Sequence, residues 1–199
     1  MNIEKIKQAI YKHPAIFSIS VVLILLTVFQ FEFVDDQWRD NRGRSLLYLA
    51  AENGDVDKVK SLLENVETPD QRDDCKWTPL MRAAQNGHLD VSRLLIDAGA
   101  DVNARDKGGY SVLMVASGAD NADILKLLTR KGARINEQDD GLGWTALIWS
   151  AKEGRYSNVA ALLEAGADTS LRDSTGKSAY DWSVEKGYVA IAEKLKNQN

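Results

Sequence analysis

The sequence predicts an all-α solenoid of about five helix-turn-helix units with β-turn fingers, preceded by one transmembrane helix. Two observations carry this prediction. A segment of about 33 residues recurs five times from residue 40 onward, and residues 15–34 form an apolar run whose only charge is Glu32. A fixed period of this size indicates units that stack, because a single such unit cannot bury its own apolar surfaces.

The composition restricts the class of protein. The chain has 199 residues, of which 44% are hydrophobic and 27% charged, as in an ordinary globular protein. Its net charge of −4 argues against nucleic acid as the main partner, since phosphate binding needs a basic surface. The single cysteine, Cys75, excludes an internal disulfide and a cysteine-based zinc cluster.

The apolar run predicts a membrane anchor. Twenty helical residues span about 30 Å, which matches the hydrocarbon core of a bilayer. We therefore expect a short cytoplasmic tail at 1–14, a transmembrane signal-anchor helix at 15–34 and a linker at 35–39. A cleaved signal peptide is an alternative, although the run is long for one and lacks small residues at its end. A buried soluble helix is another, but no matching apolar partner exists elsewhere in the chain.

The positive charges that set the orientation of this anchor are nearly balanced. Three lysines precede the run and three arginines follow it, so the positive-inside rule barely decides. The short basic tail favours an N-terminus in the cytoplasm. In a bacterium, this places the protein in the inner membrane with one pass and its large domain in the periplasm. A cytoplasmic-facing domain is the alternative.

The repeated units follow one pattern. Each opens with a turn, continues with a Ser or Thr placed to cap a short helix, and ends that helix near a glycine in most units. A second helix with leucine or valine at helical spacing follows. The units begin near Asp40, Asp73, Asp106, Asp140 and Asp173.

One unit shows the pattern in full. The segment TPLMRAAQNGHLDVSRLLIDAGADVNARD, at 78–106, resembles the ankyrin repeat, and the likeness extends over 40–199. The whole chain resembles a bacterial, N-terminally membrane-anchored ankyrin repeat protein. The resemblance implies helical hairpins in a row with β-turn fingers, and it implies binding of a protein partner.

The chain departs from the family at several positions. The histidine of the family's T-P-L-H motif is replaced in every unit, by Tyr48, Met81, Met114, Ile148 and Asp181. We therefore expect the hydrogen bonds of that histidine to be missing. Lys76 takes the place of the turn glycine in the second unit, and the charged last unit is expected to act as a polar cap.

The residue before each Ser/Thr cap is the first candidate for partner contact. In the family's architecture this position lies at the base of a finger and faces a concave groove, and three consecutive units carry a large aromatic residue there. The alternative is that these rings pack against one another and stiffen the fingers. We expect Trp149 and Trp182 to serve core or near-core packing. The candidate partner-binding residues are Arg44, Trp77, Tyr110, Trp144 and Lys177, with Gln85, Asn86, Lys152 and Glu153 beside them.

No catalytic motif is present. The two histidines, His13 and His88, and one cysteine offer few components for a nucleophile and its base, and phosphate-loop, dinucleotide and metalloprotease motifs are absent. We expect no enzyme activity, no cofactor, no metal and no small-molecule substrate.

The sequence therefore predicts a membrane-tethered protein–protein interaction module. A structural subunit of an inner-membrane complex is the alternative, and such a subunit could support a periplasmic enzyme.

Overall fold

The computed structural model describes residues 38–197 of the chain. The predicted tail 1–14, the predicted span 15–34 and residues 35–37 of the predicted linker lie outside this range. Within it, none of the helices has the length and apolar character that a membrane crossing requires. The regular structure of the described residues is helical, apart from one isolated antiparallel bridge between Arg105 and Ser111.

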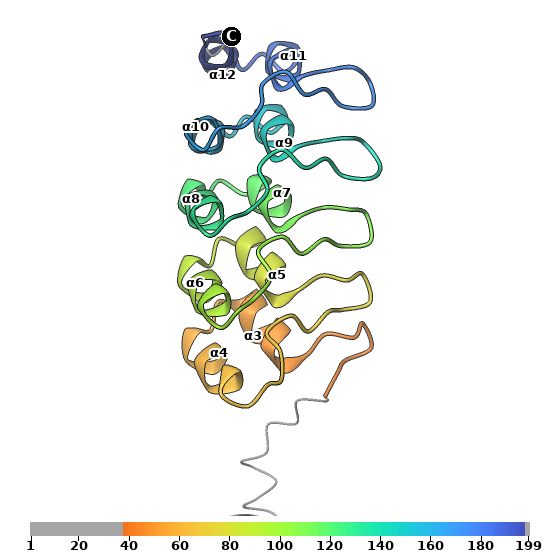
Figure 1. The fold of residues 1–199 in the computed structure, drawn as a ribbon, viewed down its shortest axis with the longest axis vertical. Coiled ribbons are helices and arrows are strands. Elements are labelled where there is room, and N and C mark those ends of the chain that lie inside the picture. The colour runs from red at the N-terminus through yellow and green to blue at the C-terminus, as the bar shows by residue number, and fades with distance from the viewer. Residues whose placement is uncertain (1–37, 198–199) are drawn as a thin grey trace, which may run out of the picture. The chain divides into compact units, whose positions relative to one another are not determined.

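Within residues 38–197, ten short helices form five hairpins that stack in one direction (Figure 1). The inner helices lie next to the finger turns, and the outer helices form a second column on the opposite side (Figure 1). The inner helices are α3 (Leu46–Asn53), α5 (Pro79–Gln85), α7 (Val112–Ser117), α9 (Ala146–Lys152) and α11 (Ala179–Glu185). The outer helices are α4 (Val56–Leu63), α6 (Leu89–Asp97), α8 (Ala122–Arg130), α10 (Tyr156–Glu164) and α12 (Val189–Lys196).

Every inner helix begins at the predicted cap. The cap hydroxyl accepts a hydrogen bond from the backbone N–H three residues later, which satisfies one of the helix's unpaired donors. This bond is present in all five units, from Ser45, Thr78, Ser111, Thr145 and Ser178. The prediction of the caps is confirmed.

The core lies between the two columns of helices and between successive units. Small alanines of the inner helices, such as Ala51 and Ala84, are fully buried and let neighbouring units approach closely. Leucines of the outer helices, such as Leu95 and Leu128, are equally buried. Each unit thus covers the apolar surface of the next.

The last unit is less polar on its outside than expected. Tyr180 and Val184 of α11 are 37% and 54% exposed, whereas their counterparts in α9, Leu147 and Ala151, are buried. No further described unit follows to cover these side chains. Charged residues of this unit, namely Glu185, Lys186, Glu193 and Lys196, are exposed as well, so the cap combines charge with uncovered apolar surface.

At two of the positions where the family has histidine, the replacing side chain forms other hydrogen bonds. The buried Tyr48 donates its hydroxyl to Asp73 and accepts from Arg82. Asp181 accepts from both the backbone N–H and the hydroxyl of Ser178, which completes a capping box. The histidine's own hydrogen bonds were expected to be missing, and in the first and fifth units these other bonds take their place.

Candidate functional site

The fingers are held by one aspartate in each unit. Its Oδ1 accepts a backbone N–H two residues later in all units, and the N–H of the residue before the helix cap also bonds to this carboxylate. Such Asx-type bonding stabilises tight turns. The aspartates are Asp40, Asp73, Asp106, Asp139 and Asp173. In the fourth unit the holding aspartate is thus Asp139, one residue before the unit start that the sequence suggests.

Neighbouring fingertips are joined by backbone hydrogen bonds. The N–H of Asp74 donates to the carbonyl of Arg42 at 3.0 Å, and Ser174 donates to Leu142 at 2.8 Å. Equivalent bonds join the tips between these two pairs, from Lys107 to Cys75 and from Asp140 to Gly108. Successive fingers therefore form a continuous row, which fixes the spacing of the side chains at their bases.

The residues before the helix caps form what we call the finger-base row. All five are half-buried, so each is both packed and accessible. They are Arg44, Trp77, Tyr110, Trp144 and Lys177.

A second row interlocks with the first. It lies on the inner helices, four residues after each cap, and we call it the inner-helix row. It consists of Leu49, Arg82, Val115, Trp149 and Trp182. The two rows and the residues that end the inner helices form one surface, which we call the finger-side surface.

Charged groups organise the N-terminal part of this surface. The Arg44 guanidinium lies 2.7 Å from the Asp40 carboxylate and 3.1 Å from that of Glu52. Arg82 lies 3.4 Å from Glu52 and stacks over the Trp77 ring at 4.6 Å. The indole N–H of Trp77 donates to Asp106 of the next finger at 2.9 Å. Trp77 is thereby fixed from both sides.

Aromatic rings organise the C-terminal part. Trp149 stands between Tyr110 and Trp144, with ring centroids 5.3 and 5.7 Å away and edge-to-face angles of 64° and 65°. Trp144 continues to Trp182 at 6.5 Å. Edge-to-face pairs of this kind add to the energy of burial. The Lys152 ammonium lies over Trp144 at 4.8 Å, which adds a cation–π contact.

The other predicted site residues lie at the ends of the inner helices. Gln85 is exposed and accepts a hydrogen bond from Arg82 at 2.8 Å through its Oε1. The exposed Asn86 donates to the carbonyl of Glu52 in the preceding unit. Glu153 lies 3.3 Å from Lys152.

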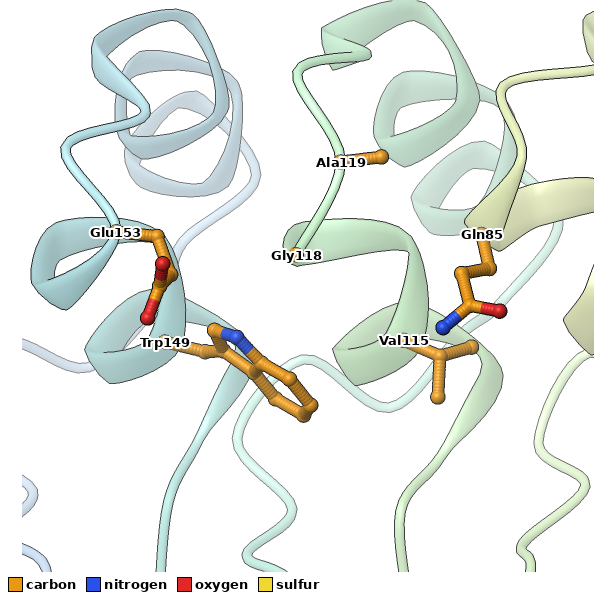
Figure 2. Close-up of a pocket in the computed structure, with 6 residues that line it drawn as sticks. All are labelled: Gln85, Val115, Gly118, Ala119, Trp149 and Glu153. Carbon is orange, nitrogen blue, oxygen red and sulfur yellow. The ribbon is translucent and has the colours of Figure 1, made fainter.

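A hollow of about 350 Å³ opens on this surface at the third unit. Figure 2 shows Trp149 projecting from α9 toward α7, with Gln85 approaching from the opposite side. The lining residues are Gln85, Val115, Gly118, Ala119, Trp149 and Glu153.

The family model for ankyrin repeats in three copies matches the chain at 15–106, 47–139 and 113–199. The chain belongs to the ankyrin repeat family. No curated protein matches the chain. The finger turns, the capped inner helices and the outer helices are thus those of an ankyrin stack.

Trp149 and Trp182 were expected to serve core or near-core packing. Both are half-buried and pack against neighbouring rings, as near-core packing predicts. They lie at the same unit position as Arg82, a residue type that is seldom buried, so this row is only partly buried.

The aromatic rings of the finger-base row show packing of the kind that the stiffening interpretation expects, whereas partner contact stays a prediction. Tyr110 and Trp144 pack against a ring, but that ring is Trp149 of the inner-helix row rather than another finger-base residue. Trp77 packs against Arg82 instead. The rings therefore stiffen the fingers and still keep part of their area open to solvent.

Burial and hydrogen bonds shift the pKa of three groups near this surface. The hydrogen bond from Arg44 lowers the pKa of Asp40 to about 2. Burial raises the pKa of the Tyr48 hydroxyl to about 12. Burial opposes ionisation of Asp173, but hydrogen bonds from Thr175, Lys177 and Trp182 outweigh it and lower the pKa to about 2. Near neutral pH, both finger carboxylates are ionised and Tyr48 is neutral.

Among residues 38–197, His88 and Cys75 are of types that often take part in catalysis. The ring of His88 contacts the backbone carbonyl of Glu52 through Nε2 at 3.1 Å, as a structural role predicts. Cys75 is an exposed free thiol at a fingertip. Among residues 38–197 no group of three or more His, Cys, Asp or Glu side chains is placed to hold a metal ion.

Proposed function

We propose that this ankyrin stack binds a protein partner on its finger-side surface. Ankyrin repeats are generally protein–protein interaction modules, and proteins built from them are typically non-enzymatic scaffolds. The proposed role needs no covalent step, no cofactor and no metal.

The observation that carries this proposal is the interlocked pair of rows. Trp, Tyr and Arg are the residues most often found as binding hot spots, and the two rows supply four tryptophans, one tyrosine and two arginines. Their side chains are already held by ring contacts, ion pairs and the finger hydrogen bonds. A partner therefore binds side chains that have little conformational freedom left to lose, which favours affinity.

The proposal includes a membrane tether at 15–34. The apolar length of that segment supports it. With the five-residue linker 35–39, which spans at most about 17 Å, the tether would hold the stack near the bilayer and raise the partner's effective concentration there. We place the stack in the periplasm of a bacterium, on the basis of the short basic tail.

The orientation is tested by a reporter. An alkaline phosphatase, which is active only outside the cytoplasm, is fused after Asn199. We expect an active fusion that stays with the membrane fraction. An inactive fusion would put the stack on the cytoplasmic side, and an active fusion in the soluble fraction would show that the apolar segment is cleaved.

Partner binding is tested by photo-cross-linking in the full chain. A photoreactive amino acid at position 86, which is exposed on the finger-side surface, is expected to capture the partner. The matched control places it at position 93, which is exposed on outer helix α6. The captured protein is then purified and its binding to the purified chain measured. Capture from position 93 alone, or no binding by the purified protein, would contradict the proposal.

A further inference from the structure

The hollow at the third unit arises from three small residues. In that unit the surface positions of the inner helix and the loop after it hold valine, glycine and alanine. The same positions carry long side chains in the units on either side. The series is Arg82, Gln85 and Asn86 in the second unit, Val115, Gly118 and Ala119 in the third, and Trp149, Lys152 and Glu153 in the fourth. The missing side-chain volume leaves a space between α5 and α9 (Figure 2).

The lining of the hollow combines an aromatic wall with one charge. Trp149 forms the wall on the α9 side, and Val115, Gly118 and Ala119 form the floor (Figure 2). Glu153 is the one ionisable residue among the lining residues, and its side chain is 41% exposed. Asp120, directly after Ala119, is exposed and adds a second negative charge in the adjoining loop. The hollow therefore combines apolar walls with the Gln85 amide, and the Glu153 carboxylate lies at its rim.

The size of the hollow limits its occupant. At about 350 Å³ it is near the lower end of small-molecule sites, which begin at roughly 300 Å³. It suits one long side chain that enters from a partner. A purely apolar side chain would remove water from Glu153 without giving the carboxylate a new partner, which costs free energy.

We propose that the hollow binds an arginine side chain of the protein partner. This inference rests on the proposed function and names the partner group that the surface recognises. The aliphatic part of the arginine packs on Val115 and Ala119. Its guanidinium stacks against the Trp149 indole and pairs with the Glu153 carboxylate at the rim.

Arginine fits this site better than lysine. Its planar guanidinium stacks on aromatic rings and can donate two parallel hydrogen bonds to a carboxylate, whereas the lysine ammonium is a compact, strongly hydrated charge. The nearby Lys152 does not fill the role, because its ammonium is engaged over Trp144 and Trp182. Its 3.3 Å contact with Glu153 is partly exposed and weak.

Gly118 provides a variant that closes the hollow. Its φ of −71° is accessible to any L-residue. A Cβ added there would meet the Trp149 ring at 3.5 Å, which is ordinary contact. Gly118→Leu therefore fills the space with no backbone strain. The matched control is Glu164→Leu, at an exposed residue of outer helix α10, away from the finger-side surface.

The test uses the full chain, purified in detergent micelles, and the peptide acetyl-Gly-Arg-Gly-amide. Binding is followed by the NMR signals of the Gly118 and Ala119 amides and the Trp149 indole. We expect these signals to move and saturate. The citrulline peptide, which has the same shape without the charge, should require at least roughly tenfold more peptide. Glu153→Gln should weaken arginine binding roughly tenfold, Gly118→Leu should abolish it, and Glu164→Leu should leave it unchanged.

Three results would overturn the proposal. They are the absence of any movement of these signals, equal binding of the arginine and citrulline peptides, and unchanged binding by Gly118→Leu. The readout is separate from the cross-linking at position 86. A chain that still captures its partner there but ignores the arginine peptide contradicts the arginine site and leaves the proposed function standing.

Discussion

Replacing Trp77 and Trp144 together with alanine is expected to weaken partner binding by roughly a thousandfold. Each tryptophan is a large half-buried ring, and a hot-spot residue contributes about 2 kcal/mol or more, so that two give about three powers of ten. The helices themselves should persist, because both residues precede a helix cap rather than belonging to a helix. The measurement is the dissociation constant of the purified partner for the full chain, with far-UV circular dichroism as the check on folding.

A matched double variant controls for the loss of exposed apolar surface. Tyr156 and Val189 are 48% and 67% exposed on outer helices α10 and α12, away from the two rows. Tyr156→Ala with Val189→Ala should bind within about twofold of the unmodified chain. If the tryptophan variant binds equally well, the finger-base row is not the site.

Replacing Asn158 with alanine is expected to lower the free energy of unfolding by about 2 to 3 kcal/mol. The side chain is completely buried, and its Nδ2 donates to the carbonyls of Ser117 and Ala119 at 3.2 and 2.5 Å. Removal leaves these carbonyls without their donor, at a cost of about 1–3 kcal/mol each. The buried Asn158 Oδ1 has no partner among the described residues, so its loss recovers part of that cost.

Urea denaturation of the full chain measures this effect. Ser157→Ala, at an exposed neighbour on the same helix, should change the unfolding midpoint little. Because Asn158 holds the loop that lines the hollow, its removal should also speed amide exchange at Gly118. An unchanged midpoint would show that the loop does not depend on Asn158.

The fold could be predicted because its signals are local. A helix cap, a turn aspartate and a stopping glycine each act within a few residues, and they recur in every unit or nearly so. Lys76 shows how strongly the turn is set. It adopts the left-handed conformation, with φ 64°, at a position where other units have glycine.

The site could be predicted only in part, because its contacts join residues of different units. The finger-base row followed from its position in the repeat, but its role in partner binding remains a prediction. The placement of Trp149 between Tyr110 and Trp144 depends on how units superpose, which no single unit encodes. The hollow had a signal that was missed, namely small residues at Val115, Gly118 and Ala119 where the neighbouring units carry long ones.

The histidine position of the first and fifth units shows the same limit of prediction from the sequence. The sequence showed only that Tyr48 replaces the family's histidine, and its hydroxyl reaches Asp73 and Arg82 of the second unit. Asp181 also replaces the histidine, and it bonds within its own helix cap. Two different side chains at the histidine position thus form hydrogen bonds, each with its own partners.

The most direct test of the account is hydrogen–deuterium exchange of the full chain with and without its purified partner. We predict slower exchange on binding in the finger turns and at the ends of inner helices α5, α7 and α9, with little change in outer helices α4, α6 and α8. Slower exchange confined to the outer helices, with the fingers unaffected, would contradict the assignment of the finger-side surface as the place where this protein acts.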